Sequence, residues 1–111
     1  KPENLILINQ VIEYIDDHIS ESFTLEQLSG IAHMNPSYFS TLFKKYNGLS
    51  VSEYTLKKRI LLSIELLSNK EDSVLCIAQT CGFRSSANFY KYFKKLTGKT
   101  PSEFRNMQSH I

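Results

Sequence analysis

The fold of this chain is decided by residues 77–105, which read IAQTCGFRSSANFYKYFKKLTGKTPSEFR. The spacing predicts a short helix, a tight turn at Gly82-Phe83-Arg84-Ser85, a longer helix with aromatic residues on one side, and a last helix. Thr100 and Glu103 have the spacing of a capping box, which marks where that last helix begins. A short helix, a tight turn and a longer helix form the helix-turn-helix, whose second helix enters the major groove of DNA.

Much of this pattern occurs a second time, about fifty residues earlier in the chain. The residues at an offset of fifty are Phe39, Phe43, Lys44, Lys45, Gly48, Ser52 and Glu53, which match Phe89, Phe93, Lys94, Lys95, Gly98, Ser102 and Glu103. Before the turn the offset is forty-nine, as for Leu28 and Ile77, so the second copy has one extra residue in its turn. Two copies are too few for a solenoid, and the repeat therefore indicates duplication of a small functional unit.

Start and stop signals predict a chain that is helical throughout. Capping residues at Thr24, Asn35, Ser50 and Thr100 mark helix starts, and left-handed glycines at Gly48, Gly82 and Gly98 mark helix ends. We expect helices at about residues 4–20, 24–33, 36–46, 50–69, 73–81, 86–97 and 101–109. The expected fold is all-α, a single domain of residues 1–111 with seven helices. Two helix-turn-helix subdomains, at about 4–49 and 70–111, are joined by a long linker helix at about 50–69.

The charge of the chain is unevenly distributed, although the net charge is only +2. Residues 1–49 sum to −3, residues 50–72 to zero and residues 73–111 to +5. A basic half beside an acidic half favours a polyanionic partner that is contacted mainly by the C-terminal half. A solvated charged face would give the same distribution, so charge alone does not decide between them.

Residues for catalysis or metal binding do not occur at recognisable spacing. Cys76 and Cys81 have neither metal-ligand nor redox spacing, and we expect both to be buried as small apolar residues. His18, His33 and His110 fall in no zinc motif, and no nucleophile elbow or phosphate-binding glycine loop is present. We therefore expect no enzymatic activity, no metal and no cofactor. No apolar run approaches the ~18 residues of a membrane span and no signal peptide opens the chain, so a cytoplasmic location is expected.

The segment 77–83, followed by Phe89, residues 92–95, Gly98 and residues 100–105, resembles the signature of the AraC/XylS family's DNA-binding domain. The first copy is similar through residues 36–39, residues 42–45, Gly48 and residues 53–54, and the linker helix has Arg59 and Leu66-Leu67 in the expected places. The resemblance runs from about residue 8 to about residue 107. Ser29 and Ser63 stand where alanine is usual in the family.

The resemblance implies double-stranded DNA as the main partner and regulation of bacterial transcription, usually activation. RNA polymerase is a further expected partner. Because the chain starts at Lys1 without an initiator methionine, it looks like a C-terminal domain whose N-terminal effector or dimerisation domain is missing.

A step of about 100° per residue divides each recognition helix into a buried and an outward side. Phe39, Leu42, Phe43 and Tyr46 share the buried side of the first helix, and Phe89, Phe93 and Leu96 share that of the second. The outward positions, which match the family's base-contacting positions, are Ser37, Ser40, Thr41, Ser86, Ala87, Tyr90 and Lys91. Serine and threonine pair with several base edges, so the first unit should discriminate weakly. Lys91 is placed to contact either guanine or a phosphate.

Phosphate contacts are expected from basic side chains and from two helix starts, at Lys44, Ser52, Arg59, Lys94, Lys95, Lys99 and Ser102. Lys95 lies on the flank of its helix, where a solvated surface charge is the alternative. A linker helix of about 20 residues spans ~30 Å, close to the ~34 Å between successive major grooves on one side of DNA. One monomer could therefore read two adjacent grooves.

Two other kinds of function fit a small helical domain. The first is a protein-interaction module that contacts the transcription machinery without intrinsic DNA specificity. The second is an RNA-binding domain, but the sequence has no single-strand stacking platform or RNA-module signature.

Overall fold

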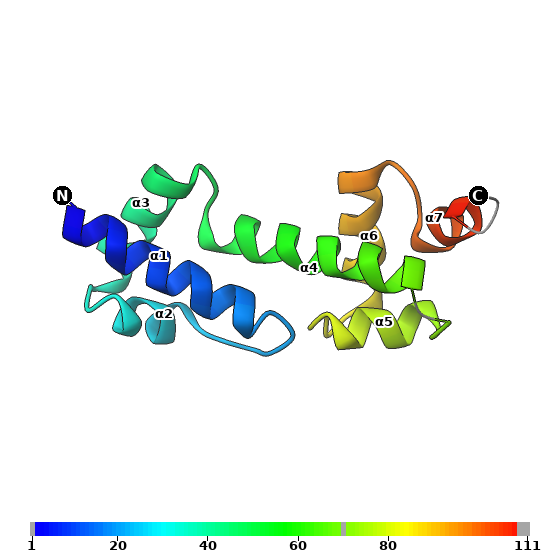
Figure 1. Ribbon diagram of the computed structural model, residues 1–111, viewed down its shortest axis with the longest axis horizontal. Helices are drawn as coiled ribbons and strands as arrows, with labels where there is room; N and C mark the ends of the chain where they lie inside the picture. The colour runs from blue at the N-terminus through cyan, green and yellow to red at the C-terminus, as the bar shows by residue number, and fades with distance from the viewer. Residues whose placement is uncertain (1, 70, 109–111) are drawn as a thin grey trace. The chain divides into compact units, whose positions relative to one another are not determined.

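A computed structural model describes residues 2–69 and 71–108, which form seven α-helices and no strand (Figure 1). The helices are α1 (Pro2–Asp17), α2 (Leu25–Ile31), α3 (Pro36–Asn47), α4 (Val51–Asn69), α5 (Val74–Thr80), α6 (Ser86–Thr97) and α7 (Pro101–Gln108). The predicted all-α class is confirmed. The first helix begins and ends earlier than predicted, and residue 109, the last of the final predicted helix, lies outside the described residues.

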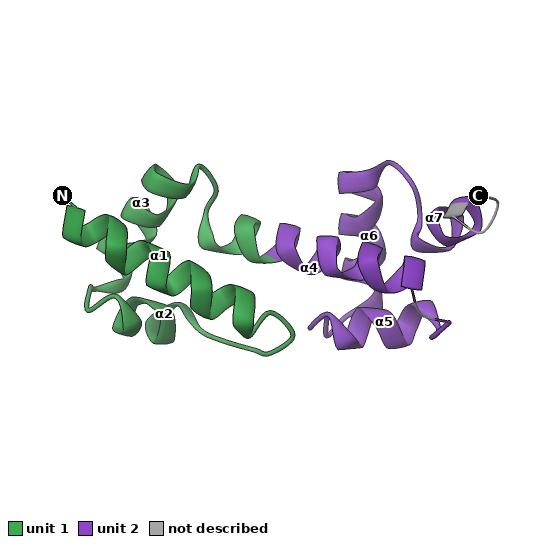
Figure 2. Ribbon diagram, viewed as in Figure 1, with its two compact units in different colours: residues 1–55 green, residues 56–111 purple. Residues whose placement is uncertain are grey.

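The chain divides into two compact units, Lys1–Thr55 and Leu56–Ile111, with the boundary inside α4 (Figure 2). Unit 1 contains α1 to α3 and the first turn of α4, and unit 2 contains the rest of α4 and α5 to α7. In the described ranges no helix is long and apolar enough to cross a membrane. The same ranges contain no group of three or more His, Cys, Asp or Glu side chains that could hold a metal ion.

Unit 1 has a core formed by α1, α2 and α3, in which α1 packs against both other helices. Its buried hydrophobic residues are Ile8, Val11, Ile15, Leu28, Ala32, Phe39, Leu42 and Phe43. Ile8, Val11 and Ile15 recur at three- and four-residue intervals, so they form the single apolar stripe that holds α1 in place. The predicted buried side of α3 is confirmed for Phe39, Leu42 and Phe43, whereas Tyr46 is exposed at the edge.

Unit 2 has its own core, formed by Ile60, Leu67, Ile77, Ala78, Cys81, Phe89 and Phe93. The ring of Phe93 lies 5.6 Å from that of Phe89 and 5.7 Å from that of Phe104, so α6 and α7 are held together by aromatic contacts. Two predictions about this core are wrong. Leu96 is 52 % exposed because it lies in the last turn of α6, beyond the residues that α6 buries. Cys76 is exposed, because α5 buries its Ile77 and Ala78 side chains but not that of Cys76. Of the two cysteines, only Cys81 is buried.

The two serines that replace the family's usual alanine are both buried. The Ser29 hydroxyl donates to the Glu26 carbonyl at 3.2 Å, and the Ser63 hydroxyl donates to the Ile60 carbonyl at 2.6 Å. Each hydroxyl therefore has a partner within its own helix, which removes most of the cost of burying it. These hydrogen bonds within the helix explain how serine fits at positions where a small residue lets two helices approach closely.

Candidate nucleic-acid interface

In unit 1 the turn between α2 and α3 is closed by two backbone hydrogen bonds. The His33 N–H donates to the Gly30 carbonyl at 3.1 Å, and the Met34 N–H donates to the Ser29 carbonyl at 3.0 Å. This is the Schellman arrangement, which needs a left-handed residue just after the helix. His33 occupies that position with φ +57°, and it is the only residue other than glycine with a positive φ in the described part of the chain.

In unit 2 the turn between α5 and α6 repeats these hydrogen bonds forty-nine residues later. The Gly82 N–H donates to the Gln79 carbonyl and the Phe83 N–H to the Ala78 carbonyl, both at 3.0 Å. Gly82 has φ +96°, as predicted from its position. Gly82 and Phe83 match His33 and Met34, and Ser85 caps α6, so Arg84 between them has no counterpart in the first turn. Arg84 is therefore the extra residue inferred from the change of offset between the two copies.

Both recognition helices start with a capped backbone. The Asn35 side chain accepts from the Tyr38 N–H at 2.9 Å, and Pro36 occupies the first helical position. In the second unit the Ser85 hydroxyl accepts from the Asn88 N–H at 3.2 Å. Capping satisfies one of the first free N–H groups of each helix and fixes where the helix begins. The cap therefore also fixes which side of the helix each of the following side chains occupies.

The outward face of α3 is small and uncharged near its start. Buried Phe39 and Phe43 hold the opposite side of the helix, which leaves Ser37 and Thr41 exposed and Ser40 half-buried. The Thr41 hydroxyl donates to the Ser37 carbonyl at 3.1 Å. Because the hydroxyl hydrogen is used within the helix, the exposed Thr41 side chain can offer a methyl group to a thymine methyl, or its oxygen as an acceptor to a base amino group.

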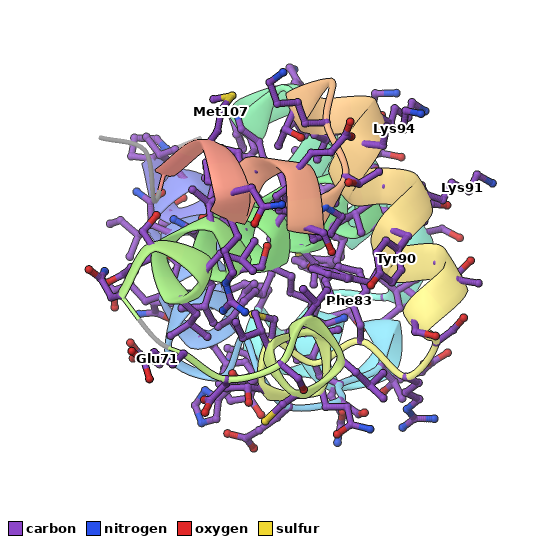
Figure 3. The ribbon with its side chains drawn as sticks, turned by 90° about the vertical axis from the view of Figure 1, so that its right-hand side faces the viewer. Glu71, Phe83, Tyr90, Lys91, Lys94 and Met107 are labelled. Carbon is purple, nitrogen blue, oxygen red and sulfur yellow. The ribbon has the colours of Figure 1, made fainter. Side chains whose placement is uncertain are left out.

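The outward face of α6 is cationic. Its four predicted base-contacting residues are all exposed, namely Ser86, Ala87, Tyr90 and Lys91. In Figure 3, Lys91 and Lys94 extend from α6 on the same side, away from the helix axis. The Lys91 ammonium lies 5.4 Å from the centre of the Tyr92 ring, within the range of a cation–π contact.

The predicted phosphate-contacting side chains fall into two groups. Lys44, Lys94, Lys95 and Lys99 are exposed. Arg59 is half-buried, and burial lowers its pKa first, followed by the positive charge of Arg84, while the Cys81 thiol acts in the opposite direction. Arg59 thus lies within electrostatic reach of the turn before α6 rather than on an open surface.

Capping boxes occupy the two helix starts at which we predicted phosphate contacts. At α4 the Ser50 N–H donates to the Glu53 carboxylate at 2.9 Å, and the Glu53 N–H donates to the Ser50 hydroxyl at 3.1 Å. At α7, Thr100 and Glu103 make the same pair of bonds, at 2.9 and 3.1 Å. Each of these helix starts therefore carries a carboxylate next to the residue predicted to contact phosphate. Ser52 directly precedes Glu53, Ser102 directly precedes Glu103, and both serines are exposed.

Tyr38 is a feature of this surface that the sequence did not reveal. Its side chain is 50 % exposed on α3, and its hydroxyl accepts from the Asn4 side chain of α1 at 3.3 Å. No sequence pattern joins residues 34 positions apart, so this contact could not have been predicted. Arg84 was also missed as an exposed basic residue, although the change of offset at the turn was a signal for it.

A family model described as a helix-turn-helix domain matches residues 28–107. Regulatory protein PocR of Salmonella typhimurium is 33% identical over 106 residues, which cover 93% of this chain and 35% of that relative. The bifunctional transcriptional activator/DNA repair enzyme AdaA of Bacillus subtilis is 34% identical over 100 residues, 90% of this chain and 47% of that relative. The chain thus spans less than half of each relative, and the repair activity in the second name is a statement about that longer protein.

A solved structure supports the same assignment. The DNA-binding domain of AdpA, described as a global transcriptional factor and crystallised in complex with a target DNA, aligns with a TM-score of 0.87 at 27% sequence identity. The alignment covers 91% of each chain. The matched family model extends over both helix-turn-helix turns. The chain therefore belongs to the AraC/XylS-type helix-turn-helix family of DNA-binding transcription regulators.

Proposed function

We propose that this domain binds double-stranded DNA with sequence preference by inserting α3 and α6 into the major groove. The observation that carries the proposal is the similarity of its fold to the AdpA domain solved on its target DNA. The exposed outward faces of α3 and α6 support it, because side chains near the start of a recognition helix reach the base edges. Both this similarity and the family favour DNA binding over a module that only contacts other proteins.

The residues divide into two roles in this proposal. Base edges are contacted by Ser37, Ser40, Thr41, Ser86, Ala87, Tyr90 and Lys91. Phosphates are contacted by Lys44, Ser52, Arg59, Lys94, Lys95, Lys99 and Ser102. Base contacts specify the sequence, and phosphate contacts fix the register and supply most of the affinity.

We further propose that one monomer reads two successive major-groove segments. The reading subdomains are residues 4–49 and 70–111, and residues 50–69 join them. Helix α4 has 19 residues, a length of about 28 Å at 1.5 Å per residue, which is close to the ~34 Å of one DNA turn. Inserting about 5 base pairs between the two half-sites should abolish specific binding, and unchanged affinity would show that two independent heads are flexibly joined.

DNA binding can be tested by gel shift with duplex DNA in the presence and absence of heparin. Selection from random duplexes would then give the preferred site. Six to eight phosphate contacts predict a log–log dependence of affinity on salt with a slope of roughly −5 to −7. A slope near zero, or no shift of any duplex, would favour the protein-interaction module instead.

In the whole protein, we expect activation of transcription through contact with RNA polymerase, controlled by an N-terminal effector or dimerisation domain. The expected location is the cytoplasm, where bacterial DNA is found. Transcription in vitro from a promoter that carries the selected site, with and without the whole protein, tests activation directly. A decrease in transcript would identify a repressor.

A further inference from the structure

Two helices of the chain begin with the same reciprocal pair of hydrogen bonds but use different residue types at the third helical position. At α2 the Thr24 N–H donates to the amide oxygen of Gln27 at 2.8 Å, and the Gln27 N–H donates to the Thr24 hydroxyl at 3.1 Å. At α7 the corresponding distances between Thr100 and Glu103 are 2.9 and 3.1 Å. A neutral amide therefore makes the same cap as a carboxylate, and the negative charge of Glu103 is not needed to start α7.

The carboxylate of Glu103 lies in a basic part of unit 2. Its hydrogen bonds with Thr100 lower its pKa most, and the positive charges of Lys94 and Lys99 lower it further. The side chain is fully exposed and ionised at neutral pH. Lys99 directly precedes the cap residue Thr100, and we assign both lysines to phosphates, so the carboxylate lies among residues that are expected to contact the DNA backbone.

The backbone at the start of α7 has few N–H groups that could bind a phosphate and so compensate for the negative charge of Glu103. Pro101 is the first helical residue and has no N–H group, and the Glu103 N–H already donates to Thr100. Of the first three helical residues, only Ser102 keeps an N–H that is outside the capping box. A phosphate approaching this donor would meet the neighbouring carboxylate.

We propose that Glu103 limits the affinity of unit 2 for DNA, because its exposed carboxylate at the start of α7 repels the phosphate backbone there. This inference rests on the proposed DNA-binding function. The effect acts on the backbone charge and not on base edges, so it applies equally to every duplex sequence.

The test compares two substitutions that remove the same charge from the same unit. Glu103→Gln keeps the cap, as Gln27 does at α2, and Glu71→Gln is the matched control. Glu71 is exposed and lies, in Figure 3, on the side of unit 2 away from Lys91 and Lys94. Affinity is measured for the preferred site and for a scrambled duplex, at low and high salt, together with the melting temperature.

Glu103→Gln should tighten binding to both duplexes by about three- to ten-fold at low salt, as expected for relief of one or two repulsions across ~6 Å of water. The gain should shrink at high salt, where such charges are screened, and the melting temperature should stay close to that of the unchanged chain. Glu71→Gln should change affinity by less than about two-fold, because Glu71 lies farther from the expected DNA-binding side of unit 2 and its charge is screened over that distance.

Equal effects of the two substitutions would show that only net charge matters, and would overturn the inference. Weaker or unchanged binding by Glu103→Gln would overturn it as well. Failure of the unchanged chain to bind any duplex is a different result, since it would overturn the proposed function itself and this inference with it.

Discussion

Tyr54 donates its phenolic hydrogen to the carboxylate of Asp16 across 2.9 Å, and this bond joins the first turn of α4 to the last turn of α1. The ring of Tyr54 also packs edge-on against that of Phe43, with 5.8 Å between their centres. Burial first, and then the hydrogen bond and the negative charge of Asp16, raise the pKa of Tyr54 to about 12. The residue thus connects α1, α3 and α4 within unit 1.

Tyr54→Phe should lower the free energy of unfolding by about 0.5–1.5 kcal/mol, the usual net contribution of one hydrogen bond. Burial of the phenol, together with this bond and the charge of Asp16, also makes stability depend on pH. Folding favours the protonated phenol, so this contribution is complete below the unfolded pKa of ~10 and is lost as the pH rises through about 12. Urea denaturation at pH 8 and pH 11 should show that the difference between the unchanged chain and the variant shrinks at the higher pH.

Asp16→Asn and the double variant complete a thermodynamic cycle with Tyr54→Phe. The two single effects should be non-additive, because each substitution removes the same bond. Additive effects would show that the bond contributes nothing to the stability of unit 1, and a difference that stays constant between pH 8 and pH 11 would contradict the raised pKa of Tyr54.

His33→Gly should stabilise unit 1. A left-handed residue with a Cβ costs roughly 1–2 kcal/mol, which is partly offset by the ~0.5–1 kcal/mol entropic cost of glycine, so we expect a net gain of up to about 1.5 kcal/mol. Gly82→Ala at the matching position should destabilise unit 2 by a similar or larger amount. Thermal melts of both variants measure this, and a stabilising Gly82→Ala would contradict the equivalence of the two turns.

Lys91→Ala and Lys94→Ala should have different effects on DNA binding, although both side chains extend from the same face of α6 (Figure 3). Lys91 lies in the first half of the helix, more than a turn after its start, so its loss should cost about 1–3 kcal/mol on the preferred site and relax preference at one or two base pairs. Lys94 is in the last turn, and its loss should weaken all duplexes alike and reduce the salt slope by about one unit.

The measurement is affinity for the preferred duplex and for single-base variants of it, with both lysine substitutions. Equal weakening of all duplexes by Lys91→Ala would assign Lys91 to a phosphate. Phe93→Ala is not a useful probe of contacts, because loss of a fully buried phenylalanine typically costs about 3–5 kcal/mol of stability.

The two cysteines should differ in reactivity toward an alkylating reagent. Cys76 is exposed on α5, whereas Cys81 is buried in the core of unit 2 and burial raises its pKa to about 11. The reactive species is the thiolate, so Cys81 should react only when unit 2 unfolds. Mass spectrometry after brief labelling at neutral pH should find one modified thiol without urea and two with urea. Rapid labelling of Cys81 in the folded chain would contradict this core.

The sequence predicted those parts of the structure that depend on neighbouring residues. Capping residues lie within three positions of the groups they bind, and the left-handed glycines directly follow their helices, so both could be identified from local spacing. The same holds for the buried aromatic side of each recognition helix. The outward positions of α3 and α6 are exposed, as the helical periodicity predicts, except for the half-buried Ser40. Their contacts with DNA remain predictions.

The features that the sequence did not predict depend on residues far apart in the chain. The bond between Tyr54 and Asp16 joins residues 38 positions apart, and no local pattern indicates it. Leu96 has the helical spacing of a buried residue, but its burial depends on whether another element covers the last turn of α6. Cys76 was assigned to the core from residue type alone, which does not say which side of α5 faces inward.

The separate cores have a consequence for the synthesis of the protein. The buried residues of the hydrophobic core of unit 1 lie between Ile8 and Phe43, and those of the core of unit 2 lie between Ile60 and Phe93. Contacts of such short range in sequence form quickly, because little chain has to be ordered to make them. Once residue 55 has left the ribosome, the first unit has every side chain of its core and can fold while the second is still being translated.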